Sequence, residues 1–251
     1  MLKSDASGLY QVPIEYEAFL GAENDDLSHY AALAARLGGP VLDLATGTGR
    51  VALHLASQGL WVHGLDNSEP MLALARQRAS ERALDVQWVQ ADLRDFDLGQ
   101  SFALALLPYN GLQHLHTSDA ITAFFTCLNR HLPTGAHFAL DVHLPQPLLL
   151  ARDPDEWFGV EMGPQLPDGP SVLAERTAYD GLSQVLTQTW ALSDGQGGRI
   201  ERSLALRQFF PQELEALLLA HGWRILERQG SFGTQALKGP ILKQILLAVR
   251  I

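Results

Sequence analysis

Apolar runs alternate with segments of helical spacing over the first 143 residues of the chain. The VLDLA run at residues 41–45 has the length and apolar character of a buried strand, whereas RVALHLASQG after it repeats apolar residues three and four positions apart. This alternation is typical of parallel strands joined by crossover helices. Further strands are expected at residues 61–66, 86–92, 102–108 and 137–143, and further helices at residues 24–39, 69–83 and 118–131.

The pattern changes after residue 143. Residues 144–170 hold six prolines and little periodicity, so we expect loop or irregular structure there. Three strand-like segments separated by turn sequences follow, and they predict an antiparallel arrangement. These strands are expected at residues 171–180, 183–192 and 199–210, followed by a helix at 211–222 and strands at 223–230 and 243–251.

Together these patterns predict an α/β protein built on a doubly wound sheet. Residues 1–143 and 211–251 are expected to form the sheet and its helices. Residues 144–210 are expected to form an inserted loop plus antiparallel strands that cover a substrate. This inserted segment has no evident use in binding a cofactor, which favours an enzyme.

Composition narrows the class of protein. The chain has 251 residues, of which 47% are hydrophobic and 18% charged, as expected for a globular protein with a large core. Its net charge of -10 disfavours a nucleic-acid substrate, because such proteins normally carry a basic surface. The single cysteine, Cys127, suits a reducing compartment and is expected to be buried packing in a helix. No leader is evident and no apolar run reaches the roughly 20 residues of a membrane span, so we expect a cytoplasmic protein.

The small-residue turn after the first strand points to a ligand that approaches the backbone closely. Gly47 and Gly49, with Ala52, match the spacing of the dinucleotide-binding fingerprint. Asp66, which ends the second strand, is placed to bind a ribose hydroxyl pair. Asp43 within the first strand would repel a pyrophosphate, but it suits the cationic groups of S-adenosylmethionine. The balance favours S-adenosylmethionine, and an NAD(P)-dependent oxidoreductase stays open as the alternative.

Four segments taken in order also carry a family resemblance. VLDLATGTG, GLDNSEPMLALAR, VQADLRDF and LLPYNGLQHL resemble the ordered motifs of class I S-adenosylmethionine-dependent methyltransferases. The resemblance implies a seven-stranded, mostly parallel sheet whose last strand is antiparallel. The usual first glycine of the motif is Ala45 here, and the residue before the second glycine is Thr46. The strands inserted before the last helix further resemble a small-molecule branch that includes sugar N-methyltransferases, which does not name a substrate.

The resemblance also implies a set of donor-binding residues. Asp43, Ala45, Gly47 and Gly49 are expected around the methionine part of the donor. Asp66 is expected at the ribose hydroxyls, Asn67 beside the adenine, and Asp92 with Leu93 at the adenine edge. Leu107, near the end of the fourth strand, is included among the donor-binding residues. The alternative for Asp92 is that the acids at 92, 95 and 97 only cap turns.

The reaction implied by this donor needs alignment more than strong acid or base catalysis, because the sulfonium is already an activated leaving group. Tyr109 and Asn110, directly after the fourth strand, are the candidates for positioning. His114 and His143 are candidates for removing a proton from the acceptor, and a packing or surface role is the alternative for each. No Cys/His spacing resembles a zinc site, so no metal is expected.

The acceptor is expected to be a small molecule bound between the ends of strands four and five and the inserted strands. A protein acceptor and a non-catalytic S-adenosylmethionine-binding protein stay open. Aromatic residues placed to line this pocket, or equally to form the core of the inserted strands, are Tyr16, Trp157, Phe158 and Trp190. Met71 and Leu74 are expected in the core rather than at the adenine.

Overall fold

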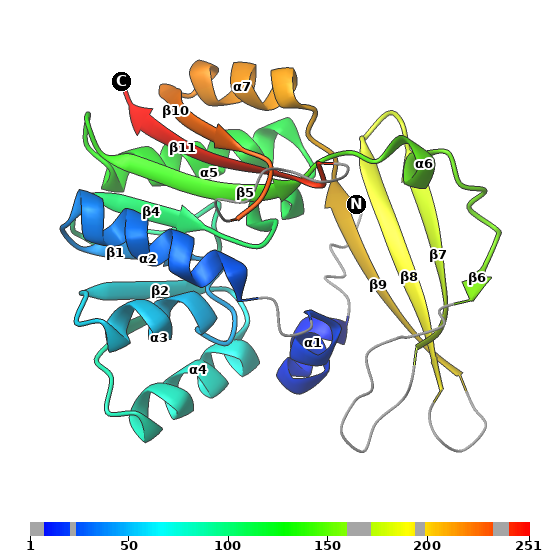
Figure 1. Cartoon of the computed structure of the whole chain (residues 1–251), viewed down its shortest axis with the longest axis horizontal. Coiled ribbons are helices and arrows are strands. Elements are labelled where there is room, and N and C mark those ends of the chain that lie inside the picture. Colours follow the sequence, from blue (N-terminus) through cyan, green and yellow to red (C-terminus); the bar gives the residue numbers. More distant parts are fainter. Residues whose placement is uncertain (1–7, 21–23, 160–171, 194–198, 233–240) are drawn as a thin grey trace.

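A seven-stranded sheet organises the fold in this computed structural model, which describes residues 8–20, 24–159, 172–193, 199–232 and 241–251 (Figure 1). The sheet runs in the order β10-β11-β5-β4-β1-β2-β3. Neighbouring strands among β1 to β5 pair in parallel, and β11 pairs antiparallel with both β5 and β10. The predicted doubly wound sheet with an antiparallel last strand is therefore confirmed. The strands are β1 (Val41–Leu44), β2 (Val62–Asp66), β3 (Gln87–Gln90), β4 (Leu104–Leu107), β5 (His137–His143), β10 (Trp223–Gln229) and β11 (Lys243–Arg250).

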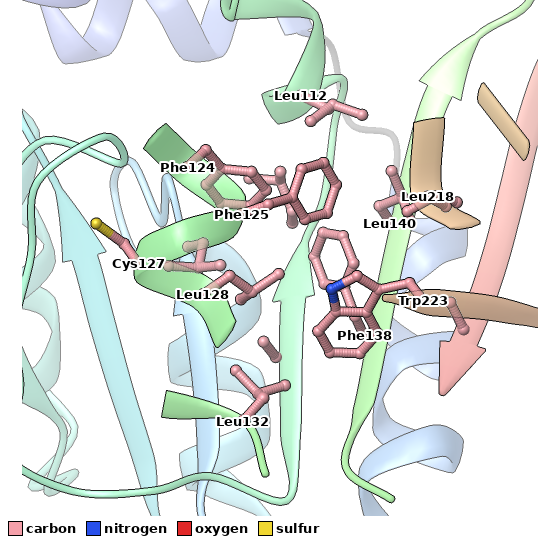
Figure 2. Packing of buried hydrophobic residues seen from close by; sticks show 14 of the residues in the cluster. Leu112, Phe124, Phe125, Cys127, Leu128, Leu132, Phe138, Leu140, Leu218 and Trp223 are labelled. Atoms are coloured by element: carbon pink, nitrogen blue, oxygen red, sulfur yellow. The ribbon is translucent and has the colours of Figure 1, made fainter. Parts of the chain in front are cut away.

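Helices cover both faces of this sheet because side chains alternate between the faces of each strand. Leu42 and Leu44 of β1 face a core with α5 and α7, whereas Val41 faces a second core with α2 and α3. Figure 2 shows part of the first core, in which Phe125 and Phe138 pack near Trp223. The helices are α2 (Asp25–Leu37), α3 (Arg50–Ser57), α4 (Glu69–Glu81), α5 (Ser118–His131) and α7 (Pro211–Ala220).

Residues 8–20 form a segment that the sequence patterns did not predict. It consists of a 3₁₀ turn at Gly8–Gln11 and helix α1 (Pro13–Leu20). The 3₁₀ turn contacts both α4 and β9 (Arg199–Arg207), so this N-terminal segment connects the helices that cover the first sheet with the inserted strands. In Figure 1 the blue α1 lies between α4 and the strands of the second sheet.

The inserted strands form a second, four-stranded antiparallel sheet in the order β6-β7-β8-β9. It stands beside the first sheet in Figure 1. Expecting only irregular structure at 144–170 was wrong in two places, since α6 and β6 lie there. Pro147 occupies the first turn of α6, where its missing N–H is harmless. Residues 160–170 lie outside the described residues. The elements are α6 (Pro147–Leu150), β6 (Phe158–Gly159), β7 (Val172–Asp180), β8 (Val185–Ser193) and β9 (Arg199–Arg207).

Of the three residues predicted to pack in the core, two are buried and one lies at its edge. Cys127 is buried and its Sγ lies 3.4 Å from the carbonyl oxygen of Arg94. Met71 is also buried, so both predictions are confirmed. Leu74 is only half-buried, because it lies at the edge of the helix face that carries Met71 and Ala75.

Candidate functional site

The turn after β1 has the open backbone conformation that its small residues predict. Ala45, Gly47 and Gly49 all have positive φ angles, of 51°, 58° and 80°. A Cβ added at Gly49 would lie 2.7 Å from the ring of Trp88, so the turn packs directly against β3. Only glycine combines that φ angle with that close approach.

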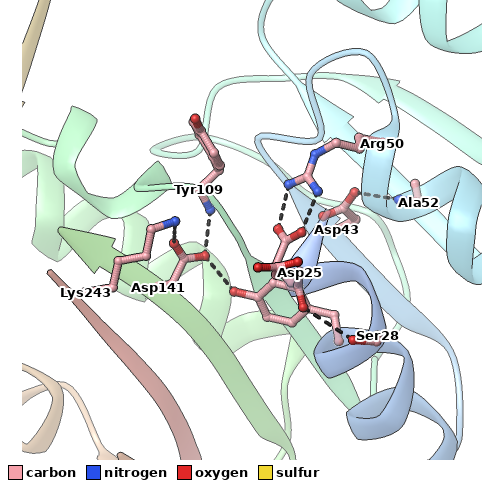
Figure 3. A network of polar contacts seen from close by, with 10 residues as sticks. Asp25, Ser28, Asp43, Arg50, Ala52, Tyr109, Asp141 and Lys243 are labelled. Atoms are coloured by element: carbon pink, nitrogen blue, oxygen red, sulfur yellow. Dashed lines mark hydrogen bonds and ion pairs between the residues drawn. The ribbon is translucent and has the colours of Figure 1, made fainter. Parts of the chain in front are cut away.

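Asp43 is buried beneath this turn and is 1% exposed. Its Oδ2 accepts a hydrogen bond from Thr46 Oγ1 at 2.5 Å. The same oxygen accepts from the Ala52 N–H at 3.1 Å (Figure 3). Its Oδ1 has no hydrogen-bond partner among the described residues. Burial raises the pKa of Asp43 to about 7, against the opposing effects of Thr46 and Arg50. A cationic ligand at this site would favour the ionised carboxylate.

Asp66 ties the end of β2 to the same turn. Its Oδ2 accepts from the Gly47 N–H and its Oδ1 from the Ser68 N–H, both at 2.8 Å. Burial raises the pKa of this carboxyl too, although the backbone hydrogen bonds oppose the shift. Each carboxylate oxygen retains a lone pair for a ligand hydroxyl. The structure thus brings Asp43 and Asp66 to one turn.

The expected adenine-side residues lie farther out. Asn67 is exposed, and its carbonyl oxygen accepts from Gln90 Nε2 at 3.2 Å. Asp92 follows β3 rather than ending it, and Arg94 binds it through Nε at 2.8 Å and Nη2 at 2.5 Å. The Arg94 hydrogen bond lowers the pKa of Asp92. Leu93 packs half-buried against the core, so the binding roles of Asn67, Asp92 and Leu93 stay predictions.

The loop after β4 lies directly beside the turn. A Cβ added at Gly111 would lie 3.7 Å from the Ala45 Cβ and only 2.4 Å from Leu107 Cδ1. Tyr109 and Asn110 both have positive φ angles, of 52° and 66°. Asn110 is buried, and its Oδ1 accepts from the His143 N–H at 2.8 Å. The amide oxygen of Asn110 is therefore directed at the backbone of β5.

His114 is paired with a tyrosine that sequence reasoning missed. The Tyr10 hydroxyl lies 3.2 Å from His114 Nε2, and the Tyr10 and Tyr16 rings are 5.1 Å apart. Burial, and then His116, lower the pKa of His114 to about 4, so its imidazole is neutral at neutral pH. Burial raises the pKa of both tyrosines. The sequence signal was slight, since the two tyrosines lie in a short segment without periodicity.

Helix α1 is fastened to the turn through Glu17, which was also missed. The Thr48 hydroxyl donates to Glu17 Oε1 at 2.7 Å, and Arg78 of α4 forms a two-point ion pair with the same carboxylate. The Arg78 hydrogen bond lowers the pKa of Glu17. A cavity of about 260 Å³ lies beside this ion pair, lined by residues that include Arg50 and Leu53.

The remaining predicted residues have other partners. The Trp157 ring lies against Arg199 at 3.9 Å and Arg176 at 4.8 Å, and the Phe158 ring lies 4.2 Å from Arg152. Trp190 is half-buried opposite Glu175 and Arg202 on β8. His143 is exposed at the end of β5. The contacts of the three aromatic residues account for packing at the second sheet, so their pocket-lining role and the proton-removing role of His143 stay predictions.

Within the described part of the chain, no three His, Cys, Asp or Glu side chains gather as a metal site would require. None of the helices in that part combines the length and apolar character needed to cross a membrane.

Comparisons with known proteins agree with this geometry. Residues 41–135 match the family described as a methyltransferase domain. An N,N-dimethyltransferase of dTDP-3-amino-3,4,6-trideoxy-α-D-glucopyranose from Streptomyces venezuelae is 30% identical over 114 residues, which are 45% of this chain and 46% of the relative. The chain spans about half or less of the length of the curated relatives it matches.

Solved structures extend the likeness over nearly the whole chain. The CcbJ methyltransferase from Streptomyces caelestis has a TM-score of 0.76 and 27% identity, covering 92% of this chain and 97% of its own. CalS10, an amino pentose methyltransferase from Micromonospora echinaspora, has a TM-score of 0.69 and 22% identity over 94% of both chains, which speaks for the fold. Residues 41–135 thus match a methyltransferase domain, and the fold of nearly the whole chain is similar to that of solved methyltransferases.

Proposed function

We propose that this protein transfers a methyl group from S-adenosylmethionine to a small-molecule acceptor. The observation that carries the proposal is the pair of carboxylates at the glycine turn, of which Asp43 is buried and Asp66 is half-buried. Burial disfavours two negative charges there, and a ligand with an ammonium and a sulfonium relieves that cost. A pyrophosphate would increase it, which speaks against a dinucleotide.

The donor-binding roles follow the geometry of the turn. Asp66 would accept hydrogen bonds from the two ribose hydroxyls, while Asp43, Ala45, Gly47 and Gly49 would surround the methionine part. The other members of the proposed donor site are Asn67, Asp92, Leu93 and Leu107.

The donor supplies a methyl group on a positively charged sulfur that leaves as a neutral thioether. Tyr109 would help align the acceptor in line with that bond, and the Asn110 side chain holds the loop that carries Tyr109. Tyr10 and Tyr16 would exclude water from the same space. The inserted segment at 144–210 would cover the acceptor, since the loop after β4 is bonded to β9.

We propose an amine as the acceptor group. Relatives named for methylating amino sugars support this choice, since they are 30% and 35% identical to this chain over 114 and 96 residues. His114, with its pKa lowered to about 4, would stay neutral and accept a hydrogen bond from the acceptor. A base that weak is a poor sink for a proton at neutral pH, so His114 would orient the acceptor rather than deprotonate it.

Calorimetric titration with S-adenosylhomocysteine tests the donor site. We expect micromolar binding by the wild type, its loss in Asp66→Ala, and its retention in Asp95→Ala, which removes an exposed carboxylate near β3. NADH is the control ligand. Binding of NADH without S-adenosylhomocysteine would support the oxidoreductase alternative, and donor binding without methyl transfer to any of a panel of small-molecule amines would indicate a non-catalytic binding protein.

A further inference from the structure

A buried carboxylate that the donor site does not use lies on β5. Asp141 is 0% exposed, and its Oδ1 accepts from the Tyr30 hydroxyl at 2.7 Å and from the Tyr109 N–H at 2.8 Å. Lys243 Nζ of β11 lies 3.6 Å from the other oxygen (Figure 3). One side chain thus joins α2, β11 and the loop after β4.

The loop that Asp141 holds is conformationally demanding. Tyr109 and Asn110 are consecutive non-glycine residues with positive φ angles, each of which costs about 1 kcal/mol or more. Such strain persists only where surrounding contacts compensate for it. Asp141 provides two of them, because its side chain accepts from Tyr109 and its carbonyl oxygen accepts from the Asn110 N–H at 3.1 Å.

Lys243 stabilises the buried Asp141 carboxylate and also contacts Tyr109. An unpaired charge at a fully buried site is costly, and the ammonium supplies the opposite charge. The same ammonium lies 5.1 Å from the centre of the Tyr109 ring, within the range of a cation–π contact. Asp141 therefore holds the backbone of Tyr109 while Lys243 contacts its ring.

We infer that Asp141 is a positioning residue that sets the place of Tyr109 beside the proposed methyl-transfer site, with Tyr30 and Lys243 holding the carboxylate. The role of Tyr109 in methyl transfer rests on the proposed function, because Tyr109 is expected next to the donor. The structural part of the inference, the dependence of Tyr109 on Asp141, does not need a ligand.

Fluorine NMR of protein labelled with 3-fluorotyrosine tests this directly. The chain has five tyrosines, so each resonance can be assigned by single Tyr→Phe substitutions. In Asp141→Ala we expect the Tyr109 resonance to broaden or move towards that of free fluorotyrosine. Asp141→Asn keeps an acceptor oxygen and should preserve a sharp resonance. Tyr179, on β7, serves as the internal reference.

A matched control separates positioning from general loss of stability. Asn129 accepts from Trp223 Nε1 and donates to the His221 carbonyl, so Asn129→Ala removes two hydrogen bonds on the α5 side of the sheet. We expect it to lower the melting temperature without moving the Tyr109 resonance. If Asp141→Ala does not fold, Tyr30→Phe and Lys243→Met provide the same test with milder changes.

The outcomes separate the inference from the proposed function. A Tyr109 resonance unchanged in folded Asp141→Ala, or in both milder variants, would overturn the inference. Addition of S-adenosylhomocysteine should shift the Tyr109 resonance in the wild type but not in Asp141→Ala. Failure of the wild type to bind S-adenosylhomocysteine would defeat the proposed function, while the ligand-free spectra would still decide whether Asp141 holds Tyr109.

Discussion

Three carboxylates expected at different parts of one donor site have different surroundings in the folded chain. Asp43 and Asp66 are drawn into the turn, where burial raises the pKa of each. Asp92 lies farther out, where Arg94 lowers its pKa. The first two destabilise the empty site when ionised, and a cationic ligand offsets that effect. Under the proposed function, the turn would thus be less stable without its ligand than with the donor bound.

Donor affinity should therefore depend on pH through Asp43. Its pKa in the fold is about 7 against an ordinary 3.8, so the folded chain keeps a proton that the unfolded chain releases. The resulting stability is complete below the ordinary pKa and is lost as pH rises through about 7. Binding of the ammonium group of S-adenosylhomocysteine should displace this proton.

We expect affinity for S-adenosylhomocysteine to increase up to about tenfold from pH 6 to pH 8. Calorimetry in two buffers of different ionisation enthalpy measures the released proton. Asp43→Asn should flatten the profile, whereas Asp92→Asn should retain its slope. An unchanged slope in Asp43→Asn would mean that another group titrates.

Gly49 and Gly59 form a matched pair for testing the close approach at the turn. Both have a φ angle of 80°, but a Cβ at Gly59 would meet nothing within 4 Å. Gly59→Ala should lower the free energy of unfolding by about 1 kcal/mol from backbone strain alone. Gly49→Ala should lower it by a further 1–3 kcal/mol, approximately, because the Trp88 ring it meets is also held against Gly64. Urea unfolding measures both, and equal losses would show that the ring moves freely.

Among the elements, α1 depends most on contacts outside itself. It has eight residues, too few for a stable isolated helix, and Glu17 binds Thr48 of the turn and Arg78 of α4. The Glu17 carboxylate therefore holds this short helix against the turn that follows β1. Its position is consequently linked to the site in a way that helical periodicity does not reveal.

Loss of the Glu17 carboxylate should loosen α1 selectively. Glu17→Gln removes the ion pair with Arg78, a loss of roughly 1 kcal/mol for a partly buried two-point pair, so amide exchange in residues 13–20 should accelerate about fivefold. Glu69→Gln is the control, because it breaks a more exposed ion pair with Arg76 on α4. Hydrogen exchange with mass spectrometry measures both variants, and equal exchange in the wild type and Glu17→Gln would contradict this role.

Polar contacts from the loop after β4 connect the two sheets of the molecule. Gln113 is fully buried, accepts from the His143 N–H at 3.0 Å and donates to the Arg207 carbonyl of β9 at 2.7 Å. His116 Nε2 lies 2.9 Å from the Ala205 carbonyl oxygen of the same strand. The loop proposed to position the acceptor therefore also positions its proposed cover.

Gln113→Leu should destabilise the fold by about 2 kcal/mol, because it removes the hydrogen bonds of a fully buried side chain to the Arg207 carbonyl and the His143 N–H. Gln188→Leu removes a glutamine hydrogen bond within the second sheet and should have less than about half that effect, since Gln188 is only half-buried. Urea unfolding compares the two variants. Similar losses would indicate that the link between the sheets contributes little.

Periodic patterns in the sequence were sufficient for most of the fold. The alternation of apolar runs with helical spacing predicted the strands and helices of the first sheet, because burial of one face imposes a period of 2 or 3.6 on any chain. The small residues of the turn predicted its open backbone, and the structure brings Asp43 and Asp66 together there, while ligand binding at this turn stays a prediction. The sequence patterns did not predict short elements such as α1 and β6. These elements contain too few residues to show a period, and contacts with distant parts of the chain hold them in place.

The tertiary structure alone decided which polar groups meet and what their charges become. Asp141 and Lys243 are 102 positions apart in the sequence, and Glu17 and Arg78 are 61 apart, so neither pair has a local signature. The same holds for Tyr10 with His114, and for the raised pKa of Asp43 against the lowered pKa of Asp92. Local sequence determines periodicity and backbone conformation, but burial and long-range pairing set the energy of a charge, and these exist only after the chain has folded.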